Sequence, residues 1–193
     1  IGALLAIAAL VLCVVFSAIH HNPYAVVSSC LYGSTLIILY TMSCLYHSLK
    51  VNNAKRVFRI IDHCSIFLLI AGTYTPLTLV SLDGPIGWTL FGIIWGVSIL
   101  GIILNAIDLN KYKVISMILY IMMGWAIIFT FPRLLKVIDM AGIYLLVAGG
   151  IVYTIGAIFY GVGKKIKYMH SVFHFFVLAG SILHFFAILL YVI

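Results

Sequence analysis

Long apolar runs follow one another along this whole chain, and they constrain its fold more than any other feature. Of its 193 residues, 65% are hydrophobic, only 8% are charged, and none is glutamate. A soluble domain of this size has to cover its surface with polar groups, so the composition indicates that the solvent is lipid. Each run has about the twenty residues with which an α-helix crosses about 30 Å of hydrocarbon, whereas barrel strands would alternate over about ten residues. The sequence therefore predicts an all-α integral membrane protein.

The runs predict seven transmembrane helices joined by short loops. Turn residues and charges mark the loops, as in HHNP at 20–23, SLDGP at 81–85 and GKKIK at 163–167. No loop is long enough to hold a soluble domain, so we expect a single seven-helix transmembrane domain over residues 1–193. The expected spans are 1–19, 24–49, 58–80, 86–106, 113–131, 141–161 and 168–192.

The positions of lysine and arginine predict the orientation of the bundle. Cytoplasmic loops retain these residues, and with seven spans most of them share a side with the N-terminus, whereas Arg133 and Lys136 lie opposite. We therefore expect a cytoplasmic N-terminus and an outside C-terminus in a multi-pass protein of the cell membrane. This topology and attraction to anionic lipid headgroups explain the net charge of +7. The expected partners are membrane lipids and not nucleic acid.

Ionisable side chains from three distant spans fall at one depth. His47 in the second span, Asp62 in the third and His170 in the seventh each lie three residues inside a lysine or arginine of the inner rim. At 1.5 Å per residue this places them about 5 Å below the rim, with His174 one turn deeper. Ser43 precedes His47 by one turn and joins the same layer. Ionisable groups inside a membrane are costly and usually functional, so this layer is the candidate site.

The histidines of this layer have the pattern of a zinc site. His170 and His174, at i and i+4, would place both imidazoles on one face of their helix. Together with His47 they would make a set of three imidazoles that leaves a fourth tetrahedral position open, as in catalytic zinc sites. Iron, copper and nickel accept the same ligands, but the absence of a redox partner favours Zn²⁺. Asp62 and Ser43 would then hydrogen-bond the bound water or an imidazole.

Simpler interpretations stay open for each of these residues. The histidines could serve only as hydrogen-bonding groups between helices. Asp62 could pair with Arg59 or Lys55 at the interface, and Ser43 could bond a carbonyl of its own helix. His63 follows Asp62 and points about 100° away from it, which makes it a poorer ligand.

Three further features have structural interpretations. His184 lies about 15 Å beyond His174, too far to share an ion with it, so we expect it to hydrogen-bond within the bundle. Pro76 is expected to kink the third span. Gly92 and Gly96 have the spacing of a helix-packing motif, which indicates packing within the chain, the favoured interpretation, or the face of a homodimer.

Several motifs recur in a recognisable order along the chain. They are S-x3-H at Ser43 and His47, FRIIDHCSIFLLIAGTYTP at 58–76, MGWAIIF at 123–129, GAIFY at 156–160, and H-x3-H at His170 and His174. In this order they resemble the hemolysin III branch of the progestin and adipoQ receptor family, over essentially the whole chain. Members usually carry a polar leader ahead of the first span, and this chain starts just after that position.

The resemblance implies a seven-helix bundle with an inward N-terminus and a zinc ion near the cytoplasmic side. By position, His47, His170 and His174 would be the zinc ligands, and Asp62 and Ser43 would organise the zinc-bound water. The bacterial members of the family imply a bacterial inner membrane and a role in membrane lipid homeostasis.

Three functions are compatible with these patterns. The first is a zinc-dependent hydrolase of a lipid amide or ester bond, in which Asp62 acts as general base or orients water. The second is a non-enzymatic sensor or receptor whose zinc holds helices together. The third is a hemolysin-like pore or transporter, although no ladder of polar residues crosses the predicted spans as a conduction path would require.

Overall fold

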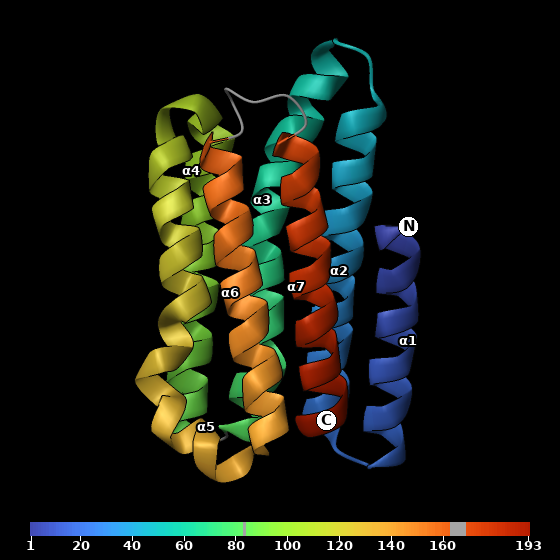
Figure 1. Ribbon diagram of the computed structural model, residues 1–193, viewed down its shortest axis with the longest axis vertical. Coiled ribbons are helices and arrows are strands. Elements are labelled where there is room, and N and C mark those ends of the chain that lie inside the picture. The colour runs from blue at the N-terminus through green and yellow to red at the C-terminus, as the bar shows by residue number, and fades with distance from the viewer. Residues whose placement is uncertain (83, 163–168) are drawn as a thin grey trace. The chain divides into compact units, whose positions relative to one another are not determined.

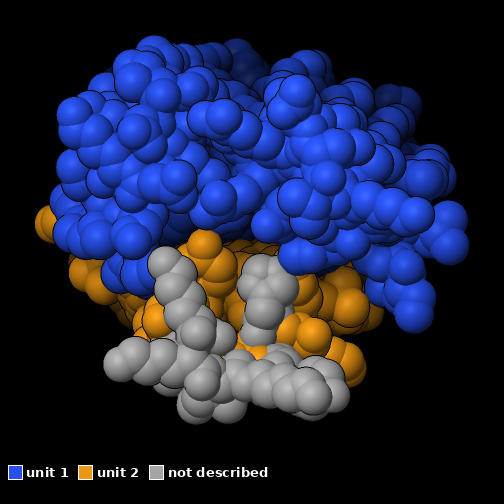
Figure 2. Space-filling model, turned by 90° about the horizontal axis from the view of Figure 1, so that it is seen from above, with its two compact units in different colours: residues 1–123, 193 blue, residues 124–192 orange. Residues whose placement is uncertain are grey.

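The structure, a computed structural model, describes residues 1–82, 84–162 and 169–193. These residues form helices and no strand. They divide into two compact units, residues 1–123 with 193 and residues 124–192, which Figure 2 colours separately. Among the described residues, six helices are long and apolar enough to cross a membrane. The prediction of an all-helical membrane protein is confirmed.

The first unit begins with three helices that pack in chain order. α1 (Gly2–Ile19) lies against α2 (Pro23–Ser48), and α2 lies against α3 (Asn53–Pro76) (Figure 1). Asn22 and Asn52 cap the N-termini of α2 and α3, because each side chain accepts a hydrogen bond from a backbone N–H of the first turn. These caps fix the residues at which α2 and α3 begin after each short loop.

Small side chains occupy the contact between α1 and α2. The buried hydroxyls of Ser17 and Ser29 hydrogen-bond to each other at 2.8 Å. A Cβ added to Gly33 would overlap the side chain of Leu10, so the two helices approach closely there. Large apolar residues such as Leu4, which is 73% exposed, cover the rest of α1. That distribution suits a helix surrounded by lipid, where no large apolar core drives helices together.

Pro76 ends α3, and a π-helix, η1 (Leu77–Ser81), follows it. Proline lacks the N–H that would continue the α-helical bonding. The sequence does not predict this wider turn, in which the N–H of Leu82 donates to the carbonyl of Leu77 at 2.9 Å. Residues 71–78 are all buried, so the irregular backbone is enclosed by the fold.

The next helix, α4 (Gly84–Trp125), reverses direction at Asp108. The backbone there is not helical, with φ −156° and ψ 95°. The Asp108 carboxylate caps the second arm by accepting from two backbone N–H groups just after it, at 3.0 Å each. Across the reversal, the Ser116 hydroxyl donates to Asn105 Oδ1 at 2.6 Å. A straight helix would separate those two residues by about 16 Å along its axis, so α4 is a helical hairpin.

The second unit is built on a helix pair. α6 (Met140–Val162) packs against α7 (Met169–Tyr191). Two short helices precede this pair: η2 (Ala126–Thr130) and α5 (Phe131–Val137). The expected spans 113–131 and 141–161 leave residues 132–140 as a loop. That expectation is wrong for most of this stretch, because Pro132 lies in the first turn of α5, a position that favours helix initiation. The predicted loop at 163–167 lies outside the described residues.

Gly92 and Gly96 lie on an open face of α4. Both are exposed, and among the described residues a Cβ added to either glycine would meet no atom within 4 Å. Packing of these glycines within the chain, the interpretation favoured by their spacing, is therefore wrong within the described residues of the first unit. The neighbouring Ile93 is 56% exposed on the same helix.

Candidate functional site

Ser43 on α2 and Asp62 on α3 meet where these two helices pack. The Ser43 hydroxyl donates a hydrogen bond to the Asp62 carboxylate. Asp62 is only 9% exposed, and Ser43 is half-buried. A buried carboxylate is costly unless hydrogen bonds replace its hydration. The hydroxyl from the neighbouring helix therefore replaces part of the hydration that burial removes from the carboxylate.

The two cations that could have neutralised Asp62 are engaged elsewhere. The Lys55 ammonium donates to the carbonyl of Leu49 at 2.9 Å. The Arg59 guanidinium donates to Asn110 Oδ1 at 3.1 Å. Among the described residues, neither cation forms an ion pair with Asp62. The alternative interpretation, in which Asp62 pairs with Arg59 or Lys55 at the interface, is therefore wrong for the described residues.

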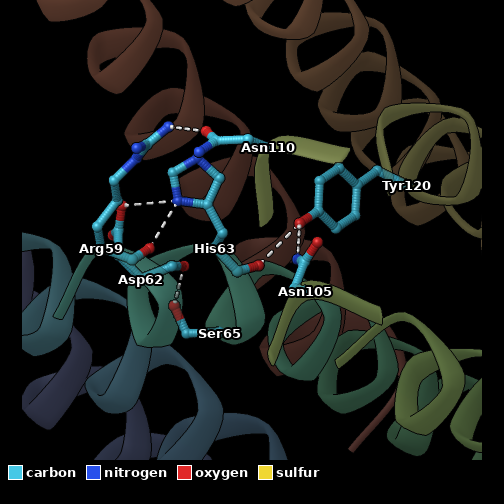
Figure 3. A network of polar contacts seen from close by, with 7 residues as sticks. All are labelled: Arg59, Asp62, His63, Ser65, Asn105, Asn110 and Tyr120. Atoms are coloured by element: carbon cyan, nitrogen blue, oxygen red, sulfur yellow. Dashed lines mark hydrogen bonds and ion pairs between the residues drawn. The ribbon is translucent and has the colours of Figure 1, made fainter. Parts of the chain in front are cut away.

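His63 lies closer to Asp62 than helical geometry alone predicts. Its Nδ1 is 3.8 Å from Oδ2 of Asp62, and the two side chains are 17% and 12% exposed. The same nitrogen is 2.8 Å from the carbonyl of Arg59, one turn earlier in α3 (Figure 3). With the Nδ1–H donating to that carbonyl, the ring folds back along its own helix and borders the carboxylate.

The three predicted zinc ligands lie on two helices. His47 is exposed on α2, one turn beyond Ser43, with its ring centroid 4.6 Å from that of Tyr46. His174 is half-buried on α7. His170 belongs to the first turn of α7, and its side chain lies outside the described residues. Within the described residues, no group of three or more His, Cys, Asp or Glu side chains is placed to hold a metal ion.

His47 and His174 also belong to different compact units. His47 lies in the first and His174 in the second. The zinc site thus stays a prediction, while the Ser43 and Asp62 contact is a feature of the first unit alone.

A buried polar network around Tyr120 holds the backbone beside Asp62. The Tyr120 hydroxyl donates to the carbonyl of His63 at 2.7 Å. Asn105, which is 0% exposed, donates from Nδ2 to the Tyr120 hydroxyl at 3.3 Å and accepts from Ser116 at 2.6 Å (Figure 3). The α4 hairpin is thereby tied to α3 at the level of the candidate site.

The sequence arguments miss this network. One signal for it was available, because Asn105 is an amide inside a predicted span, where an unsatisfied polar group costs several kcal/mol. Tyr120 carries no comparable signal, since its partner is a backbone carbonyl that no residue pattern reveals. The ring of Tyr120 also packs on Phe67 of α3, with centroids 4.3 Å apart.

His184 has the structural role expected of it. Its Nε2 lies 3.1 Å from the carbonyl of Leu146 and donates to it, which links α7 to α6. A Cβ added to Gly149 would overlap the imidazole, so the glycine makes room for this ring. Tyr153 packs against the ring with centroids 5.3 Å apart. The prediction that His184 hydrogen-bonds within the bundle is confirmed.

Known proteins match almost the whole chain. A family model described as Haemolysin-III related matches residues 1–185. Hemolysin-3 of Bacillus cereus is 42% identical over 193 residues, covering 100% of this chain and 88% of that protein. The Hemolysin-3 homolog of Bacillus subtilis (strain 168) is 40% identical over 191 residues, covering 99% and 89%.

A more distant likeness extends to animals. The monocyte to macrophage differentiation factor of Homo sapiens is 27% identical over 169 residues, covering 84% of this chain and 69% of that protein. No solved structure matches.

Proposed function

Since this chain belongs to the Haemolysin-III related family, we propose that it is a zinc-dependent hydrolase that cleaves an amide or ester bond of a membrane lipid. The observation that carries the proposal is the buried Asp62 carboxylate, which accepts from Ser43 and forms no ion pair with a described lysine or arginine. A carboxylate not neutralised by a cation keeps its capacity to take a proton from water. The bacterial relatives support a place in a bacterial cell membrane, and we propose that the protein acts there in membrane lipid homeostasis.

The proposed topology has seven crossings and a cytoplasmic N-terminus. The apolar stretch Gly84–Val137 has 54 residues. As one straight helix it would measure about 80 Å, far more than the roughly 30 Å of hydrocarbon. The reversal at Asp108 supports two crossings within it, which added to the other five make seven. The excess of lysine and arginine on the N-terminal side supports the orientation.

His47, His170 and His174 are the residues that would hold the zinc ion. Neutral imidazoles suit zinc, and His47 lies one turn from Ser43, whose hydroxyl bonds the carboxylate of Asp62. Zinc held by three imidazoles supplies a Lewis acid that activates water and polarises a carbonyl group. Asp62 would accept the proton of the attacking water and later return it to the leaving group. Ser43 would keep the carboxylate oriented for that transfer.

The test combines metal analysis with an assay of fatty acid release from a panel of membrane lipids. We expect about one zinc per purified chain, lost in His47→Ala and in His174→Ala. Asp62→Asn should keep the zinc but lower the release rate by a factor of about 10² to 10⁴, because it removes the general base. Asp108→Asn is the matched control, since an asparagine oxygen can still cap the second arm of α4.

Two outcomes would contradict the hydrolase. One is a zinc-loaded protein that releases no fatty acid from any lipid of the panel. The other is full activity in Asp62→Asn. If the first outcome came with a large fall in melting temperature on chelation, the metal would have the structural role of a sensor or receptor.

We further propose that the face of α4 with Gly92 and Gly96 forms a homodimer contact. Both glycines are exposed and have open space around them among the described residues. Glycines four residues apart let two membrane helices approach until their backbones touch.

A further inference from the structure

Four exposed cations gather at the start of α3 and at the reversal of α4. Arg56 and Arg59 lie about one turn apart on α3, and Lys111 and Lys113 follow the reversal. The Arg59 guanidinium donates to Asn110 Oδ1 at 3.1 Å, so the turn of α4 lies beside α3 (Figure 3). This hydrogen bond joins two segments far apart in the chain into one positively charged region.

No described carboxylate neutralises these four cations. Among the described residues of this unit there are two acidic side chains, and both are engaged. Asp108 accepts from backbone N–H groups of its own turn. Asp62 is buried and accepts from Ser43. None of the four cations forms an ion pair with a described residue, so the region keeps a positive charge that attracts anions from outside the chain.

Aromatic rings place the region at the level of the lipid headgroups. The Lys111 ammonium lies 5.3 Å from the centroid of the Tyr112 ring, and Lys55 lies 5.5 Å from that of Tyr46. Tyrosine is enriched where hydrocarbon meets water, and lysine extends from that level toward the polar side. The cations are therefore positioned to meet phosphate groups of lipids and not their acyl chains.

We propose that Arg56, Arg59, Lys111 and Lys113 form a binding surface for the phosphate headgroup of an anionic phospholipid. Arginine presents a planar fork that matches two phosphate oxygens, and lysine adds point charges around it. The surface lies one turn of α3 from Asp62. It depends on neither the zinc ion nor hydrolysis, because it rests on charge and position alone.

The test measures lipid binding to the purified full-length chain by native mass spectrometry, with phosphatidylglycerol as the anionic probe and phosphatidylcholine as the zwitterionic one. Each removed charge should weaken phosphatidylglycerol binding about five-fold, so Arg59→Gln with Lys111→Gln should weaken it about twenty-five-fold and leave phosphatidylcholine binding unchanged. The matched control is Arg133→Gln with Lys136→Gln, which removes the same charge from exposed positions of α5. This control should change binding less than about two-fold.

A second pair of substitutions separates binding from folding. Arg56→Gln with Lys113→Gln removes two cations that make no hydrogen bond or ion pair to a described residue, so the fold should be unaffected and binding should still weaken by a similar factor. Equal losses in both surface variants and in the α5 control would overturn the proposal, because net charge alone would then explain the binding. Unchanged affinity in the two surface variants would overturn it as well.

Discussion

The hydroxyl of Ser43 on α2 donates a hydrogen bond to the carboxylate of Asp62 on α3. The two residues stand in separate apolar spans, and the packing of α2 on α3 brings them together. Inside a membrane no bulk water can solvate a carboxylate, so the neighbouring helix supplies the donor. The stability of this helix pair is therefore coupled to the residue proposed as general base.

Replacing Ser43 by alanine should lower the free energy of unfolding by about 1 to 2 kcal/mol, because Asp62 then stays buried without this donor. Thermal unfolding in detergent micelles measures the change. Ser48→Ala is the matched control on the same helix, since among the described residues the exposed Ser48 hydroxyl donates only to the carbonyl of Cys44 in its own helix. Equal melting temperatures for the two variants would show that the contact with Asp62 contributes nothing.

Tyr120→Phe should cost about 1 to 3 kcal/mol of unfolding free energy. The change removes the hydroxyl that bonds the carbonyl of His63 and leaves the buried amide of Asn105 without this acceptor. Tyr112→Phe serves as control, since the Tyr112 ring lies under the Lys111 ammonium and its hydroxyl makes no hydrogen bond to a described residue. A Tyr120→Phe protein as stable as Tyr112→Phe would disprove the structural role of the network.

Gly149→Ala should destabilise the pair of α6 and α7 by about 1 to 3 kcal/mol, because the added methyl group would overlap the His184 imidazole. Gly161→Ala on the same helix meets no atom of a described residue within 4 Å and should change stability by less than about 1 kcal/mol. Denaturation followed by circular dichroism compares them. Similar effects from both substitutions would mean that helix propensity, and not contact with His184, decides the result.

The proposed homodimer predicts a loss of association when the open glycine face is filled. Gly92→Ile with Gly96→Ile should abolish the dimer seen by chemical crosslinking in liposomes, because bulky side chains prevent close approach of two copies of α4. Gly161→Ile places one bulky side chain at another glycine with open space among the described residues and should leave crosslinking unchanged. A wild-type protein that is monomeric in liposomes would refute the contact.

The ends of α1 and α2 could be predicted from hydropathy and turn residues, whereas α3 (Asn53–Pro76) begins five residues before the expected span 58–80 and ends four residues before its end. α1 and α2 begin and end within one residue of the expected spans 1–19 and 24–49. The prediction is wrong at α5, where proline begins a helix in place of a loop, and it does not anticipate the π-helix after Pro76. The hydropathy pattern predicts where an apolar helix lies along the chain. It does not predict which hydrogen bonds the backbone forms where proline interrupts the α-helix.

The sequence by itself determined that this protein lies in lipid, that its fold is all-helical, and to which family it belongs. Inside lipid, the backbone groups of a continuous apolar run find hydrogen-bond partners only within their own helix, so the helical fold follows without any knowledge of how the helices pack. The tertiary structure alone decided that Ser43 bonds Asp62, that Arg59 and Lys55 turn to other partners, and that Tyr120 and Asn105 brace α3. These contacts join residues from different helices, and which side chains meet depends on the rotation and depth of each helix against its neighbour.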